Sequence, residues 1–382
     1  MNVYLDHAAT TPLAPEVRQH MIKLMEEVNG NPSSLHSYGK AARGVIDDTR
    51  KYIAEILGAE KQEICFTSGG TEADNMAIRS AVRNHGVQHV LTTPIEHHAV
   101  LHTLQHMAGE GEISLHYVQV DNRGHVDTDD LEAWLKKHPG SLVSIVHANN
   151  EVGTMADLET IGNLSHAYDS LFHTDTVQSV GYFNFNLKEL PVDFLAGSAH
   201  KFYGPKGVGF LYHQSDCNVA PIIHGGGQEQ HLRSGTENVH GIAGMGKALE
   251  LMEEQRAEFA PRMKELKTYF INRLRDNIPG ISFNGDPEGR SNYTVINATL
   301  PEFEGQMLFF ARLDQAGIAA SGGSACSGGG KSHVIEHLGG EHNGVTVRFS
   351  IGTSTTRGEI DYTVDKIMEI IGVSREPAPT AK

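Results

Sequence analysis

Short apolar segments alternate with helix-like segments from residue 63 to residue 213, and this alternation restricts the folds that the chain can adopt. The strand-like segments are compact apolar runs, and the segments between them carry apolar residues at helical spacing. The predicted strands are 63–67, 88–93, 112–120, 141–148, 171–175, 192–199 and 207–213. The predicted helices between them are 71–85, 97–109, 127–138 and 157–171. Strands that alternate with helices predict an α/β fold, in which a mostly parallel sheet has helices on both faces.

Beyond residue 227 the pattern becomes that of a smaller α+β unit. The predicted elements there are a helix at 238–277, a strand at 293–300, a helix at 305–317, a strand at 345–351 and a helix at 357–371. Two further helices, 15–28 and 38–57, precede the alternating region. A chain of 382 residues is long for one core, so two domains are expected. We assign 13–255 to a large domain, and 1–12 together with 256–382 to a small one.

The composition excludes several classes of function. With 31 basic and 47 acidic residues the formal net charge is −16, which argues against direct binding of nucleic acid or of an anionic membrane surface. No apolar run approaches the ~18 residues that a membrane span needs, and the start of the chain does not resemble a signal peptide. Three widely spaced cysteines form no disulfide framework, so a cytoplasmic location is expected. The 23 histidines include no closely spaced His/Cys set, and no metal site is predicted.

Polar residues follow the predicted strands at the edge where open α/β sheets form their sites. The stretch "SGGTEADN" begins at Ser68, directly after the first strand, and leads into a helix. Backbone amides at a helix N-terminus, with glycines that allow close approach, suit a phosphate group. A simple helix cap by Ser68 or Thr71 is the alternative.

Three later strands also end in polar side chains. Asp175 ends one strand and Gln178 follows it, although a strand-end acid is often only a helix cap. Asn150 follows the strand at 141–148, and Lys201 follows the strand at 192–199 inside "GSAHKFYGPKG". A lysine in a cleft can form a Schiff base, and the alternative is an ordinary solvated surface lysine. The small residues that flank Lys201 favour the cleft. A phosphate loop, an acid and a lysine together are what pyridoxal 5'-phosphate (PLP) needs.

Ten motifs cover the chain from Tyr4 to about Gly372. They are "YLDHAATTP", "GNPSSLHSYG", "FTSGGTEADN", "EHHAVL", "NNEVGT", "HTDTVQSVG", "GSAHKFYGPKGVG", "GGGQEQHLRSGTEN", "SGGSAC" and "VRFSIG". With these motifs in this order, the chain resembles the cysteine desulfurases of the NifS/IscS type, which are fold-type I PLP enzymes of the class V aminotransferase family.

The resemblance implies a role for each matching residue. Lys201 would hold the cofactor and move the Cα proton of the substrate, and His97 would stack on the cofactor ring. Asp175 would pair with the pyridine nitrogen, and Gln178 would bond the ring hydroxyl. The phosphate would be bound by Gly70, Thr71, Ser198 and His200, with Thr236 reaching the phosphate of the neighbouring subunit. Asn150 would lie near the ring and the substrate, and Arg348 would bind the substrate carboxylate, which its planar fork matches.

The family's reaction converts L-cysteine to L-alanine, and it implies that Cys326 accepts the sulfur as a persulfide. The position of Thr236 implies a homodimer with active sites shared across the interface. The resemblance further implies a sulfur-acceptor protein, such as an iron–sulfur scaffold. The segment after Cys326 is shorter and richer in glycine than in the better-known members, and the C-terminal tail is short. Both regions contribute to acceptor docking in the family, so the acceptor's identity stays open.

The stretch "SGGSACSGGGKSH", residues 321–333, also permits other interpretations. It is a near miss for a P-loop, but Ala325 stands where that motif requires glycine, and too few residues follow it for such a core. We expect the loop at 323–331 to be mobile until a substrate or partner binds, because glycine gives it conformational freedom. Lys331 and Ser332 are expected to start the next helix. The tail at 375–382 is expected to be disordered.

Two other functions use the same fold. The chain could be an aminotransferase or lyase in which Cys326 is only structural, or a non-catalytic binding protein. Retention of Lys201, Asp175, His97 and Cys326 together argues against the second. The remaining cysteines, Cys65 in a strand and Cys217 in a turn, are expected to be structural.

Overall fold

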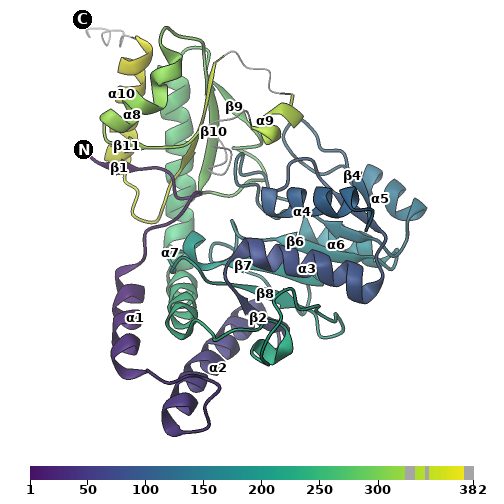
Figure 1. Ribbon diagram of the computed structural model, residues 1–382. Helices are drawn as coiled ribbons and strands as arrows, with labels where there is room; N and C mark the ends of the chain where they lie inside the picture. The colour runs from purple at the N-terminus through teal and green to yellow at the C-terminus, as the bar shows by residue number, and fades with distance from the viewer. Residues whose placement is uncertain (323–331, 340–343, 374–382) are drawn as a thin grey trace, which may run out of the picture.

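The computed structural model describes residues 1–322, 332–339 and 344–373 (Figure 1). Cys326, Lys331 and the loop and tail for which mobility and disorder were predicted lie outside the described residues. Ser332 is the N-cap of α9 (His333–His337), and its hydroxyl accepts a hydrogen bond from the Ile335 amide. The prediction that a helix starts here is therefore confirmed at Ser332. Within the described residues, no helix is both long and apolar enough to cross a membrane.

A seven-stranded sheet forms the centre of the larger part of the molecule, in the order β2-β8-β7-β6-β5-β3-β4. Its strands are β2 (Ile64–Thr67), β3 (His89–Thr92), β4 (Ser114–Tyr117), β5 (Leu142–Ser144), β6 (Leu171–Asp175), β7 (Phe194–Ser198) and β8 (Gly209–His213). The pairings from β4 to β7 are parallel, whereas β8 runs antiparallel to both β7 and β2. The predicted mostly parallel α/β sheet is confirmed.

Helices cover both faces of this sheet because its strands are apolar on both faces. Val90, Leu142 and Phe194 pack in a core with residues of α3 (Gly70–His85) and α4 (His98–Gly109). Their chain neighbours Leu91 and Leu195 point the other way. The main core on that opposite face includes residues of α5 (Thr128–Lys137) and α6 (Leu158–His166).

The C-terminal part contains a second, antiparallel sheet in the order β12-β10-β9. Its strands are β9 (Ser282–Asn284), β10 (Val295–Leu300) and β12 (Val345–Ser350). Helices α8 (Phe309–Gln315) and α10 (Arg357–Ile371) lie beside it, and the long helix α7 (Val239–Asn277) runs from here to α1 (Pro15–Glu27) and α2 (Ser37–Leu57) (Figure 1). The start of the chain joins this part through β1 (Val3–Tyr4), which pairs with β11 (Ile318–Ala319).

The division into 13–255 and 1–12 with 256–382 stays a prediction. The pairing of β1 with β11 supports grouping the first residues with the C-terminal part. The proposed boundary falls inside α7, which is continuous across it.

Some predicted elements are shorter in the structure. The strand expected at 141–148 ends at Ser144 as β5. The chain beyond it forms a turn in which the Asn149 side chain accepts hydrogen bonds from the amides of Glu151 and Val152. The helix expected at 157–171 ends at His166, shortly before Asp169, whose φ of 53° is incompatible with a continuing helix.

Candidate active site

A cavity of about 210 Å³ lies at the carboxyl ends of the central strands. Most of the residues singled out from the sequence line it: Gly70, Thr71, His97, Asn150, Asp175, Gln178, Ser198, His200, Lys201 and Arg348. They come from separate strand ends and loops, which the sheet brings to one edge. The structure therefore gathers ten of the twelve predicted site residues. Thr236 lies elsewhere, and Cys326 is outside the described residues.

One end of the cavity is built for an anion. Helix α3 begins at Gly70, so the amides of its first turn have no partner within the helix. A Cβ atom at Gly70 would lie 2.5 Å from the Cγ2 atom of Val177, so a larger residue would displace the loop that follows β6. Ser198, the buried last residue of β7, and His200 line the cavity beside this helix end. An adjoining open pocket also contains Lys206, which adds a positive charge.

Lys201 and Asp175 both line the cavity. The Lys201 ammonium donates hydrogen bonds to the carbonyl oxygens of Ala8 (2.5 Å) and Ala9 (2.9 Å). Asp175 ends β6 and is buried, and its Oδ1 atom accepts a hydrogen bond from the Val177 amide at 2.8 Å. Burial raises the pKa of Asp175 to about 6, against the opposing effects of this amide and of Lys201. The acid and the amine therefore line the same space.

His97 is the N-cap of α4, and its Nδ1 atom accepts a hydrogen bond from the Ala99 amide at 3.2 Å. Burial, with a smaller contribution from the positive charge of Lys201, lowers the pKa of His97 to about 4. The ring is therefore neutral at pH 7. A flat neutral ring at the cavity wall suits contact with another planar ring.

Gln178 donates a hydrogen bond to the Ala8 carbonyl oxygen at 2.9 Å. Its side chain therefore shares that carbonyl with Lys201. The N-terminal segment thus closes one side of the cavity and orients two of its polar side chains.

Arg348 is fully buried in β12 and reaches the cavity from the C-terminal part. One Nη atom donates to the carbonyl oxygen of Asn150 at 2.9 Å, and the other donates to Asp6 at 3.0 Å and to Ser321 at 2.8 Å. Among the described residues, the buried Nε atom of Arg348 has no hydrogen-bond partner. The guanidinium is thus held firmly in place and still has donor capacity.

Thr236 is exposed and does not line this cavity. It lines a neighbouring pocket together with Ser68 and Gly207, residues that also line the open pocket at the start of α3. The prediction that Thr236 serves a neighbouring subunit is not tested within one chain.

The class V aminotransferase family matches residues 3–363. The chain belongs to this family. It is 43% identical over 384 residues to "Cysteine desulfurase IscS" of Dictyoglomus turgidum, covering 99% of this chain and 96% of the relative. It is 40% identical over 384 residues to the protein of the same name from Methanosarcina thermophila, covering 99% of this chain and 94% of that relative. A solved structure titled "NIFS-LIKE PROTEIN" has a TM-score of 0.90 and 35% identity, covering 97% of this chain and 100% of that one. Another solved structure, "SspA in complex with cysteine", has a TM-score of 0.80 and 30% identity, covering 93% of this chain and 100% of that one.

Class V aminotransferases of the cysteine desulfurase type depend on PLP, and the cavity fits that cofactor. The helix N-terminus with Gly70 provides room and donors for its phosphate, and the buried Asp175 offers a carboxylate for a ring nitrogen. Lys201 supplies the amine that takes the aldehyde, and His97 supplies a neutral ring at the wall. The donor set therefore matches each part of PLP.

The sequence analysis did not single out two acidic residues of this class V site, Asp74 and Asp6. Asp74 lines the cavity from α3, with its Oδ1 atom 3.4 Å from the His173 Nε2 atom. Burial raises the pKa of Asp74 well above its ordinary value. Asp6, which holds Arg348, lies inside the quoted motif "YLDHAATTP", and Asp74 lies inside "FTSGGTEADN". The motifs therefore contained these residues, but only the fold shows what they contact.

Proposed function

We propose that this chain is a PLP-dependent cysteine desulfurase, which converts L-cysteine to L-alanine and transfers the sulfur to Cys326. The observation that carries the proposal is the shared cavity of Lys201, Asp175, His97 and Arg348, in a family whose similar members are named cysteine desulfurases. The solved neighbour titled as a complex with cysteine supports the same substrate.

The side chains divide the work as follows. When bound, PLP supplies an aldehyde that takes amines and a ring that accepts the electron pair released at the substrate Cα atom. Lys201 moves the Cα proton, since its amine lies in the cavity and its two backbone acceptors hold it there. Asp175 would supply a negative charge for the ring nitrogen of the bound cofactor. Arg348 receives the substrate carboxylate, and its Nε atom, which has no partner among the described residues, is an added donor.

The sulfur step breaks the bond between Cβ and Sγ of the substrate and forms a bond between that sulfur and the Cys326 sulfur. Cys326 attacks as a thiolate, the electron pair of the broken bond stays on Cβ, and a proton added there completes alanine. The atoms balance as cysteine plus thiol giving alanine plus persulfide. Cys65 and Cys217 do not suit this role, since both are buried. Burial raises the pKa of Cys217 to about 12 and raises that of Cys65 well above its ordinary value.

The proposal includes a homodimer in which Thr236 reaches the partner's phosphate site. It also includes transfer of the persulfide sulfur to an acceptor protein, such as an iron–sulfur scaffold. We propose the cytoplasm as its compartment, because the reaction needs Cys326 as a free thiol, and a reducing environment keeps it so.

The test measures alanine and sulfide formed from L-cysteine by the wild-type enzyme, Cys326→Ala and Lys201→Ala. Wild type should form both products, with sulfide released when a reductant is present. Cys326→Ala should retain the visible absorbance of bound PLP and lose at least ~10²-fold of its activity, because the acceptor of the sulfur is gone. Lys201→Ala should lose both the activity and the absorbance of the lysine-bound cofactor.

Cys217→Ala is the matched control, since it removes a buried thiol away from the cavity and should keep its activity. Full turnover of cysteine by Cys326→Ala would contradict the mechanism and favour the lyase alternative. Transfer of an amino group to a keto acid, without sulfide, would favour an aminotransferase.

A further inference from the structure

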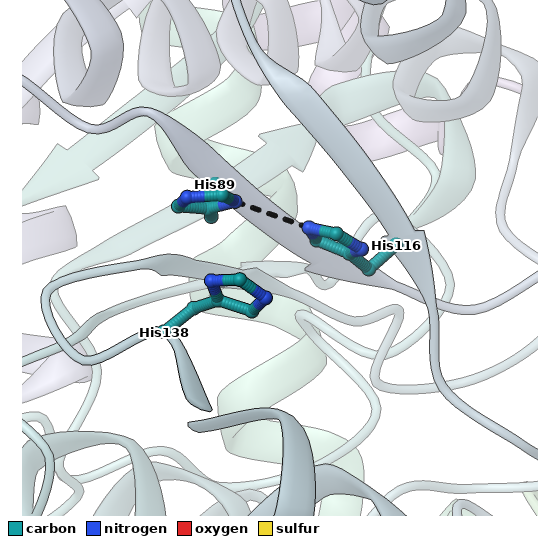
Figure 2. Close-up of side chains that lie close together, drawn as sticks. All are labelled: His89, His116 and His138. Carbon is teal, nitrogen blue, oxygen red and sulfur yellow. Dashed lines mark hydrogen bonds between the residues drawn. The ribbon is translucent and has the colours of Figure 1, made fainter. Parts of the chain in front are cut away.

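Three histidines that are far apart in the sequence meet at the edge of the large sheet (Figure 2). His89 begins β3, His116 lies in the edge strand β4, and His138 follows the last residue of α5. His116 pairs in register with Leu91, which places it diagonally next to His89 on the same face. The Nδ1 atom of His89 lies 3.1 Å from the Nε2 atom of His116. Each histidine offers one ring nitrogen within 4.8 Å of the other two.

We propose that His89, His116 and His138 form a binding site for a divalent transition-metal ion of the zinc class, with water in the remaining coordination position. Imidazole nitrogen is a preferred ligand for zinc, copper and nickel. Three such ligands with water complete the four-coordinate geometry usual for zinc. This site is separate from the PLP cavity and is not part of the proposed reaction.

The spacing of the nitrogens suits such an ion. Tetrahedral zinc with bonds of about 2.0–2.1 Å places its ligand atoms about 3.3 Å apart. The nitrogens of His89 and His116 already lie close to this spacing, and the third must approach by at most roughly 1.5 Å. The rings of His89 and His138 are stacked with centroids 3.9 Å apart. Since a metal lies in the plane of each imidazole that binds it, the rings must rotate out of this stack when the ion binds.

The surroundings of His138 leave its ring available as a ligand. Among the described residues, the buried Nε2 atom of His138 has no hydrogen-bond partner. The C-terminal end of α5 lies at His138, and its free carbonyl groups favour a cation. Lys137 opposes this, because its positive charge acts on both His116 and His138 and would repel a cation bound there.

The cluster lies away from the proposed chemistry. His89 is the first residue of its strand, whereas Asp175 and Ser198 are the last residues of theirs. None of the three histidines lines the PLP cavity. A bound ion would therefore act as a clip that joins β3 and β4 to the end of α5, and it would raise the melting temperature without changing the turnover of cysteine.

The protein carries its own reporter for this site. Trp134 is the one tryptophan of the chain, and its ring lies 4.4 Å from that of His116, centroid to centroid. Titration of the metal-free holoenzyme with ZnCl₂ should change the tryptophan fluorescence and give one zinc per chain by calorimetry. The titration is done in Cys326→Ser, so that zinc bound by the reactive thiol is not counted. MgCl₂ should produce no change, because magnesium prefers oxygen ligands.

Replacing each of the three histidines in turn tests whether they bind the ion. His89→Asn, His116→Asn and His138→Asn should each weaken zinc binding by more than the ~10–100-fold that loss of an outer-shell partner costs. Lys137→Gln should tighten it, because a like charge is removed. His106→Asn, at an exposed position of α4, is the matched control and should bind zinc as the parent does. The proposal would be overturned if all three cluster variants bound zinc as tightly as the parent does, or if the parent showed no saturable binding.

Discussion

At the scale of single residues, Glu96 is a fully buried acid next to the active-site residue His97. One of its oxygens accepts a hydrogen bond from the Thr93 hydroxyl at 2.6 Å, and burial raises the pKa of Glu96 to about 8. The folded protein therefore binds this proton more tightly than the unfolded chain does. For an acid with a raised pKa, stability is present at low pH and is lost as the pH rises towards the folded-state value.

We predict that Glu96→Gln removes this dependence. Between pH 5 and pH 8 the wild-type free energy of unfolding should fall by about 1.4 kcal/mol per pH unit from this one group, and the variant should lack that contribution. Urea unfolding at several pH values measures it, with the difference between variant and wild type growing in favour of the variant as the pH rises. Parallel stability curves for the two proteins would contradict the assigned direction.

The sequence predicted the reactive residues better than the groups that hold their side chains in place. Lys201, Asp175 and Arg348 were found because they follow strands or match family motifs, and the structure brings them to one cavity. The positions of Lys201 and Arg348 depend on the backbone carbonyl of Ala8 and on Asp6, which come from the far end of the chain. No local pattern marks such a contact, since it exists only once the first residues join the C-terminal part.

At the scale of elements, a buried ion pair ties three segments together. Arg50 of α2 binds Glu229 through two hydrogen bonds of 2.8 Å, and it also donates to the Ile64 carbonyl. Glu229 accepts a third hydrogen bond, from the Phe66 amide. Glu229 begins the short helix η3 (Glu229–His231), whose three residues all have positive φ. The pair therefore holds a strained turn, and the chain beyond this turn leads to Thr236.

We predict that Arg50→Met lowers the free energy of unfolding by about 3–5 kcal/mol, because it leaves the Glu229 carboxylate buried without its partner. The double variant Arg50→Met/Glu229→Leu should recover part of this loss, since no unpaired charge remains. Chemical denaturation of the three proteins measures both effects. A loss below ~1 kcal/mol in the single variant would show that the pair is no more important than a surface salt bridge.

Elements with strong local signals were predicted well. Helix α10 has its expected bounds, and the capping box of Thr356 and Glu359 fixes where it starts. The strands β1, β9 and β11 were missed, because two or three residues are too few to show alternation. They are strands through their pairing with distant partners, as when Val3 pairs with Ile318.

At the scale of the whole molecule, the alternating pattern was sufficient to predict the layers but not the strand order. A run of strands and helices predicts a covered sheet, and the two cores on its faces confirm it. The order β2-β8-β7-β6-β5-β3-β4 depends on which strands meet in space. The meeting of His89, His116 and His138 follows from that order, which is why the sequence indicated no histidine cluster.

Large apolar side chains are exposed on the first two helices and the loop between them. Leu35 is 89% exposed and Tyr38 67%, and Ile22 and Met25 of α1 are about half exposed. Helices α1 and α2 and the loop between them lie at the opposite end of the molecule from α8 and α10 (Figure 1). Exposed apolar side chains gathered in one region are typical of an interface with another chain. They are the surface that we assign to the proposed homodimer.

We predict that Leu35→Glu converts the dimer to a monomer, because it places a charge where apolar surface would be buried. Light scattering coupled to size-exclusion chromatography measures the mass, and alanine formation should fall together with it if Thr236 completes the partner's site. Met307→Glu is the matched control, since Met307 is 97% exposed but lies in the C-terminal part, and this variant should remain dimeric. A wild-type monomer with full activity would disprove the shared site but leave the desulfurase chemistry intact. If instead Leu35→Glu stays dimeric, the interface lies elsewhere.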